Sequence, residues 1–160
     1  MIVAMALLTV LTLLAVSSMQ VATRQEKIAG NTRDRILAFQ SAEVALREAE
    51  AQLEKATLLN FGGTNGRFEV CPREDTRQAC NTPDWQDPAS SGWITLNEKL
   101  EGTSRVPEYI IEKYPAIENS SGNLDSDRPK APEETFRVTG RGFGSTNRSM
   151  VVLQTTYRRN

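Results

Sequence analysis

The chain has 160 residues, a formal net charge of −1 and a hydrophobic content of 39%. This balance suits one domain with an appendage and argues against nucleic acid as a partner. Histidine, the commonest general base and zinc ligand, is absent from the sequence, and two cysteines alone cannot complete a structural zinc site. We therefore expect a non-enzymatic protein without a cofactor or a metal.

The first element is an apolar run, MIVAMALLTVLTLLAV, and no charged residue precedes Arg24. About 20 apolar residues cross a bilayer, so residues 1–27 are predicted to form a membrane helix. A cleaved signal peptide is the alternative, but it needs a basic leading segment that this run lacks. The apolar side chains expected to face lipid or neighbouring helices are Ile2, Val3, Leu7, Leu8, Val10, Leu11, Leu13, Leu14 and Val16.

The helical pattern continues beyond this run, which favours a retained helix over a cleaved peptide. Residues 28–60 are predicted to be amphipathic, and the stop signals Asn60 and Gly62 follow. One helix of roughly 90 Å from Met1 to about Asn60 is expected, with Gly30 as its weak point. The stripe predicted to pack on the rest of the chain consists of Ile28, Ile36, Phe39, Leu46 and Leu53.

Residues 61–160 are predicted to form a globular region with two parts. The first, 61–104, is rich in loop-forming residues and holds both cysteines in the stretch CPREDTRQAC. Two free buried thiols are one interpretation. A disulfide between Cys71 and Cys80 is favoured, because an exported segment lies in an oxidising space and such a ring stabilises a fold by about 3 kcal/mol.

The second part, 105–160, is predicted to hold an antiparallel sheet of three or four strands. Residues 109–114 are rich in strand formers. Residues 135–142 and 149–158 alternate in polarity and flank a turn, so they are expected to pair as a hairpin. The predicted fold class is α+β, with the long helix packed on this sheet.

Two motifs suggest ligand chemistry only weakly. GRGFGS, residues 140–145, is similar to a phosphate-binding glycine loop, but it lies in a predicted hairpin. Asn123, Asp125, Asp127 and Glu134 occupy positions 1, 3, 5 and 12 of a calcium loop, whereas position 6 is Arg128 rather than glycine. A solvated acidic loop is the default interpretation of the second motif.

The stretches IVAMALLTVLTLLAVSSMQ, residues 2–20, and RQEKIAGNTRDRILAFQSAEVALREAE, residues 24–50, resemble the N-terminal region of PilX-type minor pilins. The resemblance covers about the first third of the chain. The terminal stretch VVLQTTYRR, residues 151–159, is also in keeping with that group. The resemblance implies a type IV pilin-like fold.

The resemblance also implies a location and partners. A prepilin peptidase removes a short basic leader, and the protein waits in the inner membrane with its globular region in the periplasm. Together with other minor pilins it then primes pilus assembly from the pilus tip and supports display of a large tip adhesin. Major pilins carry an acid at the fifth mature position, whereas residues 1–23 contain none, which suits an apical place in the filament.

Two other functions are compatible with the sequence. One is a minor pseudopilin of a type II secretion system, whose mechanics overlap with those of a pilin. The other is a single-span membrane protein with a periplasmic ligand-binding or catalytic domain.

Overall fold

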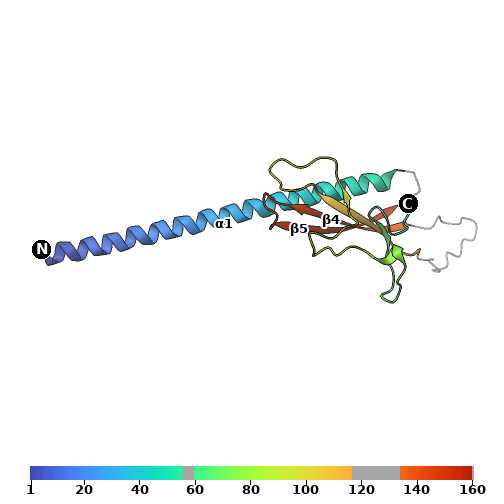
Figure 1. Ribbon diagram of the computed structural model, residues 1–160. Coiled ribbons are helices and arrows are strands. Elements are labelled where there is room, and N and C mark those ends of the chain that lie inside the picture. The colour runs from blue at the N-terminus through green and yellow to red at the C-terminus, as the bar shows by residue number, and fades with distance from the viewer. Residues whose placement is uncertain (56–59, 117–133, 160) are drawn as a thin grey trace, which may run out of the picture.

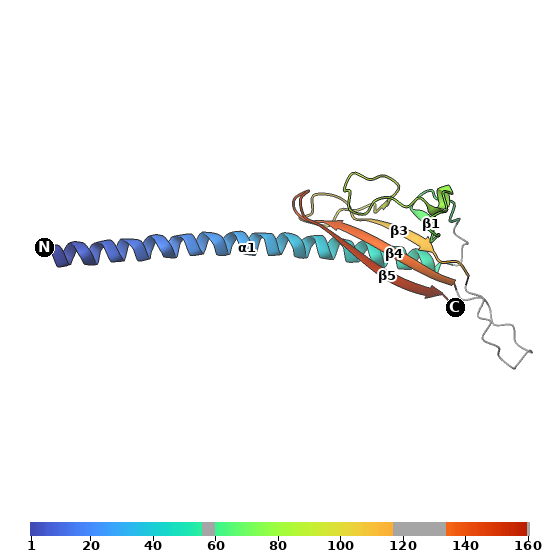
Figure 2. The same ribbon diagram turned by 90° about the horizontal axis from the view of Figure 1, so that it is seen from below.

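One long helix dominates the molecule (Figure 1). The computed structural model describes residues 1–55, 60–116 and 134–159. Helix α1 (Ile2–Glu54) has 53 residues and passes through Gly30 without a break, so it is about 80 Å long at 1.5 Å per residue. It ends short of the predicted Asn60, and residues 56–59 lie outside the described part of the chain. The first half of α1 projects away from the rest of the molecule (Figures 1 and 2).

The C-terminal half of α1 lies against a five-stranded sheet (Figure 2). The α+β, pilin-like architecture predicted from sequence is confirmed, but the sheet has more strands than the expected three or four. Its order is β1-β3-β4-β5, with β2 also paired to β3. All pairs are antiparallel except β1 with β3, which is parallel. The strands are β1 (Arg67–Glu69), β2 (Ile94–Thr95), β3 (Glu108–Lys113), β4 (Glu134–Phe143) and β5 (Met150–Arg159), and η1 (Gln78–Cys80) is a short 3-10 helix.

The predicted hairpin is confirmed as β4 and β5. The two strands pair from Glu134↔Arg159 to Phe143↔Met150. The glycine-rich stretch, residues 140–145, therefore lies in β4 and the turn that follows it. It does not begin a helix, which agrees with the hairpin interpretation and not with a phosphate-binding loop. The predicted strand 109–114 corresponds to β3, which forms the centre of the sheet between β1 and β4.

The helix face that packs on the sheet differs from the predicted stripe. Ile28, Ile36 and Phe39 are 64%, 52% and 44% exposed, so their prediction as packing residues was wrong. Leu53 is fully buried and Leu46 packs against the core. The buried residues of α1 are Ala38, Ser41, Ala42, Ala45, Ala49 and Leu53. Of these, Ala45, Ala49 and Leu53 form one core cluster with Tyr109, Ile111, Phe136 and Val138 of the sheet.

Close approach of the backbones explains this alanine face. A Cβ atom on Gly140 would lie 3.0 Å from the Ala42 carbonyl oxygen. A Cβ on Gly142 would overlap the Ala42 nitrogen and the Ala38 oxygen. Strand β4 thus lies directly on the backbone of α1, and only small side chains fit between them. Large apolar residues such as Ile36 and Phe39 therefore lie to the side of the contact.

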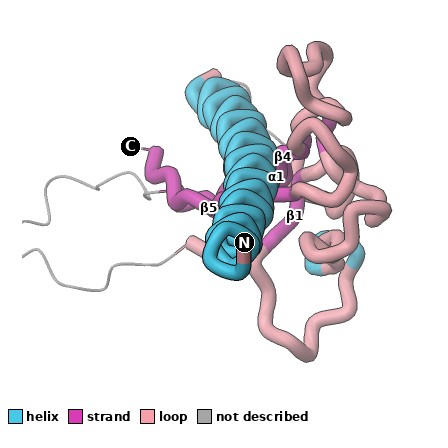
Figure 3. The backbone as a smooth tube through the Cα atoms, turned by 90° about the vertical axis from the view of Figure 1, so that its left-hand side faces the viewer, coloured by secondary structure: helices cyan, strands magenta, loops and turns pink. Residues whose placement is uncertain are grey.

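Loops cover part of the other face of the sheet (Figure 3). Arg141 is 1% exposed there, and its Nε donates to the Glu108 carboxylate at 2.6 Å. Its remaining nitrogens donate to the carbonyl oxygens of Asp87 and Ser90 and to the Ser90 hydroxyl. The guanidinium also stacks on Trp93, 4.1 Å from the ring centroid. This buried cation therefore fastens the loop that contains Ser90 and Trp93 to the sheet.

Candidate functional site

The projecting half of α1 has the dimensions of a membrane span. Residues 2–23 carry no charge, and 22 residues extend about 33 Å, close to the roughly 30 Å of a hydrocarbon core. Every side chain from Met1 to Arg33 is exposed, and α1 is the one described helix long and apolar enough, by length and composition, to cross a membrane. The exposed apolar side chains include all those singled out from the sequence: Ile2, Val3, Leu7, Leu8, Val10, Leu11, Leu13, Leu14 and Val16.

Hydroxyl groups within this segment bond to the helix itself. Thr9 donates to the carbonyl oxygen of Ala6, and Thr12 donates to that of Thr9, each at 2.8 Å. Thr23 donates to the Met19 oxygen at 3.0 Å. Because lipid offers no hydrogen-bond partners, such internal bonds lower the cost of placing these hydroxyls in a membrane.

An apolar stripe continues from the membrane segment towards the sheet. Val21 and Ile28 are seven residues apart, about two turns, and Phe39 follows eleven residues later, about three turns. The three side chains therefore lie nearly in line on α1. All are at least 44% exposed, and the stripe lies beside the alanine face. This line of exposed apolar side chains is available for contact with another molecule.

The junction between the projecting helix and the sheet is fastened by Asp34. Its carboxylate accepts hydrogen bonds from the Ser145 backbone nitrogen and hydroxyl, and from the Thr146 hydroxyl at 3.0 Å. The hydrogen bond from the Ser145 side chain, with help from Thr146, holds the pKa of Asp34 below its ordinary value of 3.8. Asp34 thus joins α1 to the β4–β5 turn through a charged acceptor. No local sequence pattern indicates this contact, because Asp34 and Ser145 are 111 residues apart.

An open groove of about 660 Å³ lies beside Asp34. We call it the junction groove; its lining residues are Gly30, Asn31, Asp34, Arg35, Ser145, Thr146, Arg148, Ser149 and Met150.

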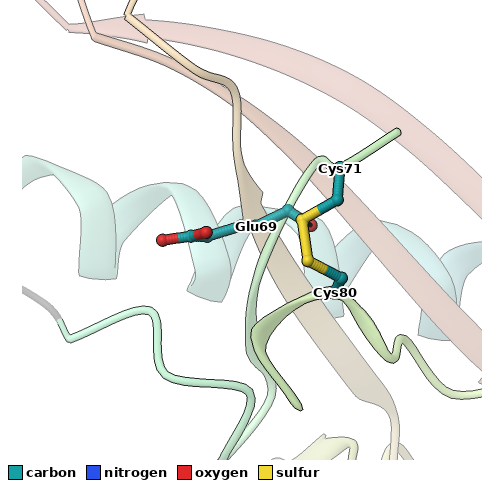
Figure 4. Close-up of side chains that lie close together, drawn as sticks. All are labelled: Glu69, Cys71 and Cys80. Carbon is teal, nitrogen blue, oxygen red and sulfur yellow. Dashed lines mark hydrogen bonds between the residues drawn. A yellow bond between two sulfur atoms is a disulfide. The ribbon is translucent and has the colours of Figure 1, made fainter. Parts of the chain in front are cut away.

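At the opposite end of the sheet, Cys71 and Cys80 form the disulfide expected from the sequence (Figure 4). Their Cα atoms are 5.5 Å apart. Glu69 and the two sulfur atoms are the one group of possible metal ligands among the described residues. Because both sulfurs are bonded to each other, they cannot bind a metal as thiolates. The disulfide is therefore a covalent link between the segment that follows β1 and the short helix η1.

Comparison with protein families gives two matches that together span nearly the whole chain. Residues 63–159 match the family described as type IV pilus assembly protein PilX C-term. Residues 1–47 match the PilX N-terminal family. This chain belongs to the PilX family of type IV pilus assembly proteins. No curated protein and no solved structure matches it. The chain is thus a minor pilin of the type IV pilus, and its apolar helix indicates membrane anchoring.

Most of the calcium-loop motif noted in the sequence lies outside the described residues. Asn123, Asp125 and Asp127 belong to that part. Glu134 is described, and its carboxylate accepts a hydrogen bond from Lys113 at 2.6 Å and pairs with Arg159. The bond from Lys113, with that from Arg159, lowers the pKa of Glu134. Glu134 thus has an established role between β3, β4 and β5.

The buried charged side chains described in this PilX-family chain form ion pairs. Glu108 pairs with Arg141 and, at 3.4 Å, with Arg105. Glu112 accepts two hydrogen bonds from Arg137. The pairs of Glu108 with Arg141 and of Glu112 with Arg137 join β3 to β4 on the face away from α1. All these pairs neutralise charge that would otherwise be costly to bury. The arrangement stabilises the sheet, and it leaves the apolar stripe exposed beside the junction groove.

Proposed function

We propose that this minor pilin joins other minor pilins in a complex that primes pilus assembly and is located at the pilus tip. The observation that carries the proposal is the exposed apolar surface of α1. It extends from Ile2 through the membrane-length segment and continues to Ile28 and Phe39 beyond it. A soluble monomer rarely exposes so large an apolar surface, which argues for lipid first and protein partners later.

The same surface can serve both stages. In the membrane, lipid surrounds the apolar side chains while the backbone bonds within the helix. In a filament, the residues would pack against helices of neighbouring subunits. Transfer from lipid to a helix bundle changes the apolar environment little, so the helix can move from anchor to assembly interface at low cost. Leu7, Leu14 and Val16 are among the side chains we assign to this interface.

An apical place in the filament is compatible with the uncharged segment of α1. Residues 2–23 contain no carboxylate, so none of these side chains forms an ion pair with the N-terminal amine of a neighbouring subunit. A subunit at the end of the filament has no subunit above it and does not require that pair. Its outward surface would also be free to support display of a large tip adhesin.

The proposed route begins in the inner membrane. A prepilin peptidase removes the leader, and the globular region faces the periplasm. The disulfide between Cys71 and Cys80 supports this orientation, because disulfides persist in oxidising compartments.

Deletion of the gene, followed by complementation with the full chain, tests the proposal. The expected result is a large loss of surface pili and of the adhesin from sheared pili, with recovery on complementation. Normal pilus number and tip composition in the deletion strain would contradict it. Co-purification of the full chain in detergent should recover other minor pilins; recovery of secretion-system components would instead favour a pseudopilin.

A further inference from the structure

The alanine face of α1, which packs on the sheet, continues towards the N-terminus as a basic face. Arg24, Lys27, Asn31 and Arg35 follow one another at steps of three and four residues and lead directly into Ala38. They therefore lie on the same face of the helix as the alanine contact. From Ala38 towards the C-terminus, the sheet covers this face. From Arg24 to Arg35, every side chain except that of Asp34 is exposed.

The β4–β5 turn adds a further cation to this face. Arg148 is exposed and lines the junction groove together with Asn31 and Arg35. The arginines and lysine of this set form no ion pair within the described part of the chain. Asp34 is the acid that lines the groove, and its oxygens already accept bonds from Ser145 and Thr146. Four cations and one acid leave the surface net positive.

The position of this surface relative to the membrane follows from the helix. If the hydrocarbon boundary lies at Thr23, Gly30 lies about 10 Å above it and Arg35 about 18 Å above it, at 1.5 Å per residue. The headgroup layer is several ångströms thick, and surface potential extends about a further 8 Å at physiological ionic strength. A tilt of about 20°, common for spanning helices, towards the basic face would bring Arg148 nearer.

We propose that this face, Arg24, Lys27, Arg35 and Arg148 around the junction groove, docks on the phosphate headgroups of acidic phospholipids. The proposal rests on the membrane-anchored stage of the proposed function. Charge complementarity and continuity with the apolar span favour lipid over an acidic protein. Docking tilts α1 towards this face and holds the β4–β5 turn at the membrane surface until the subunit is extracted.

The test uses the full chain in lipid nanodiscs with a fluorophore on Asn147→Cys, in the turn. Headgroup-nitroxide lipid quenches the fluorophore only when the turn lies at the surface. Discs of phosphatidylcholine alone are compared with discs that also contain phosphatidylglycerol. We expect stronger quenching in the acidic discs and its loss in about 1 M salt, where the Debye length falls to about 3 Å.

The charge variant is Arg35→Gln with Arg148→Gln. Because each cation near an acidic surface favours binding severalfold, the ratio of docked to undocked protein should fall by roughly tenfold or more. Arg73→Gln with Lys99→Gln is the matched control, since both side chains are exposed and lie outside the groove; it should quench like the parent protein.

Equal quenching in the two kinds of disc, or full quenching in the charge variant, would overturn the proposal. So would a charge variant that quenches normally but no longer co-purifies with another minor pilin, because the groove would then bind protein. The parent chain could instead show quenching that depends on acidic lipid but recover no minor pilin on co-purification. That result would support lipid docking and contradict the proposed function.

Discussion

At the scale of single residues, two glycines of different surroundings show what sets the distance between α1 and the sheet. Gly142 has no space for a side chain, because the backbone of Ala38 and Ala42 occupies it. Gly30, in the projecting half of the same helix, has nothing within 4 Å of a Cβ position. Replacement of glycine by alanine is therefore expected to have opposite effects on stability at these two positions.

Gly142→Ala should lower the free energy of unfolding by at least 1–3 kcal/mol, about the cost of overpacking a core, because the helix must move away from β4. Gly30→Ala should raise helix stability by about 0.5–1 kcal/mol. Urea unfolding of the full chain in detergent, followed by tryptophan fluorescence, measures both. Similar midpoints for the two variants would show that the close backbone contact does not form.

Arg141 is the second residue whose removal should be severe. Arg141→Gln leaves the buried Glu108 with Arg105 alone, 3.4 Å away, and breaking a buried pair typically costs about 3–5 kcal/mol. Because Arg105 compensates in part, we expect a loss near the lower limit of this range by the same unfolding measurement. Arg77→Gln, at an exposed pair, is the control and should leave the midpoint unchanged. An unchanged midpoint in Arg141→Gln would contradict the role of this cation.

At the scale of elements, the sequence was sufficient for those with strong local patterns. The long helix, the β4–β5 hairpin and β3 follow from periodicity and turn residues. The helix face that packs on the sheet could not be predicted in this way. Large apolar side chains such as Ile28 and Phe39 dominate a hydrophobic pattern, whereas alanines contribute little to it. Gly140 and Gly142, alternating along β4, could have indicated a close backbone contact and hence the alanine face.

Non-local contacts were the other limit of sequence analysis. Strand β1 has three residues, and its parallel pairing with β3 joins Arg67 to Ile111; no local pattern predicts such a pairing. The Asp34 contact likewise spans more than a hundred residues. The disulfide could be predicted because the chain has two cysteines close in sequence.

The Asp34 contact predicts how the helix–hairpin junction responds to acid. The pKa of Asp34 is below 3.8 in the folded chain, so its contribution to stability is present above that value and is lost as the pH falls through the lower folded pKa. Amide hydrogen exchange in residues 144–149 should therefore become less protected below about pH 3.8, after correction for the intrinsic rate.

Asp34→Asn provides the comparison. It keeps an acceptor oxygen but has no charge to titrate, so the turn should be less protected at neutral pH and should lose little further protection in acid. Glu134 also has a lowered pKa, but it lies at the other end of β4. Parallel loss of protection at the turn in the parent protein and Asp34→Asn would assign the acid response elsewhere.

At the scale of the whole molecule, one helix has two environments. Its C-terminal half is buried through alanines on a sheet that is held together by ion pairs and a disulfide. Its N-terminal half has no partner among the described residues, and Ile28, Ile36 and Phe39 extend this exposed surface beyond the membrane-length segment. Three of the five side chains predicted to pack on the chain's own sheet, Ile28, Ile36 and Phe39, are thus available for partners.

Phe39→Ala should accordingly weaken assembly without weakening the fold. The ring is 44% exposed and is absent from the buried core, so the unfolding midpoint should change little. Recovery of other minor pilins by the full chain in detergent should fall severalfold, because loss of a well-packed interface aromatic typically costs more than about 1 kcal/mol. Trp85→Ala is the matched control: Trp85 is 52% exposed but belongs to the loop region rather than to α1. If both variants recover partners equally well, the apolar stripe is not an assembly surface; if Phe39→Ala also lowers the unfolding midpoint markedly, its effect on assembly follows from instability.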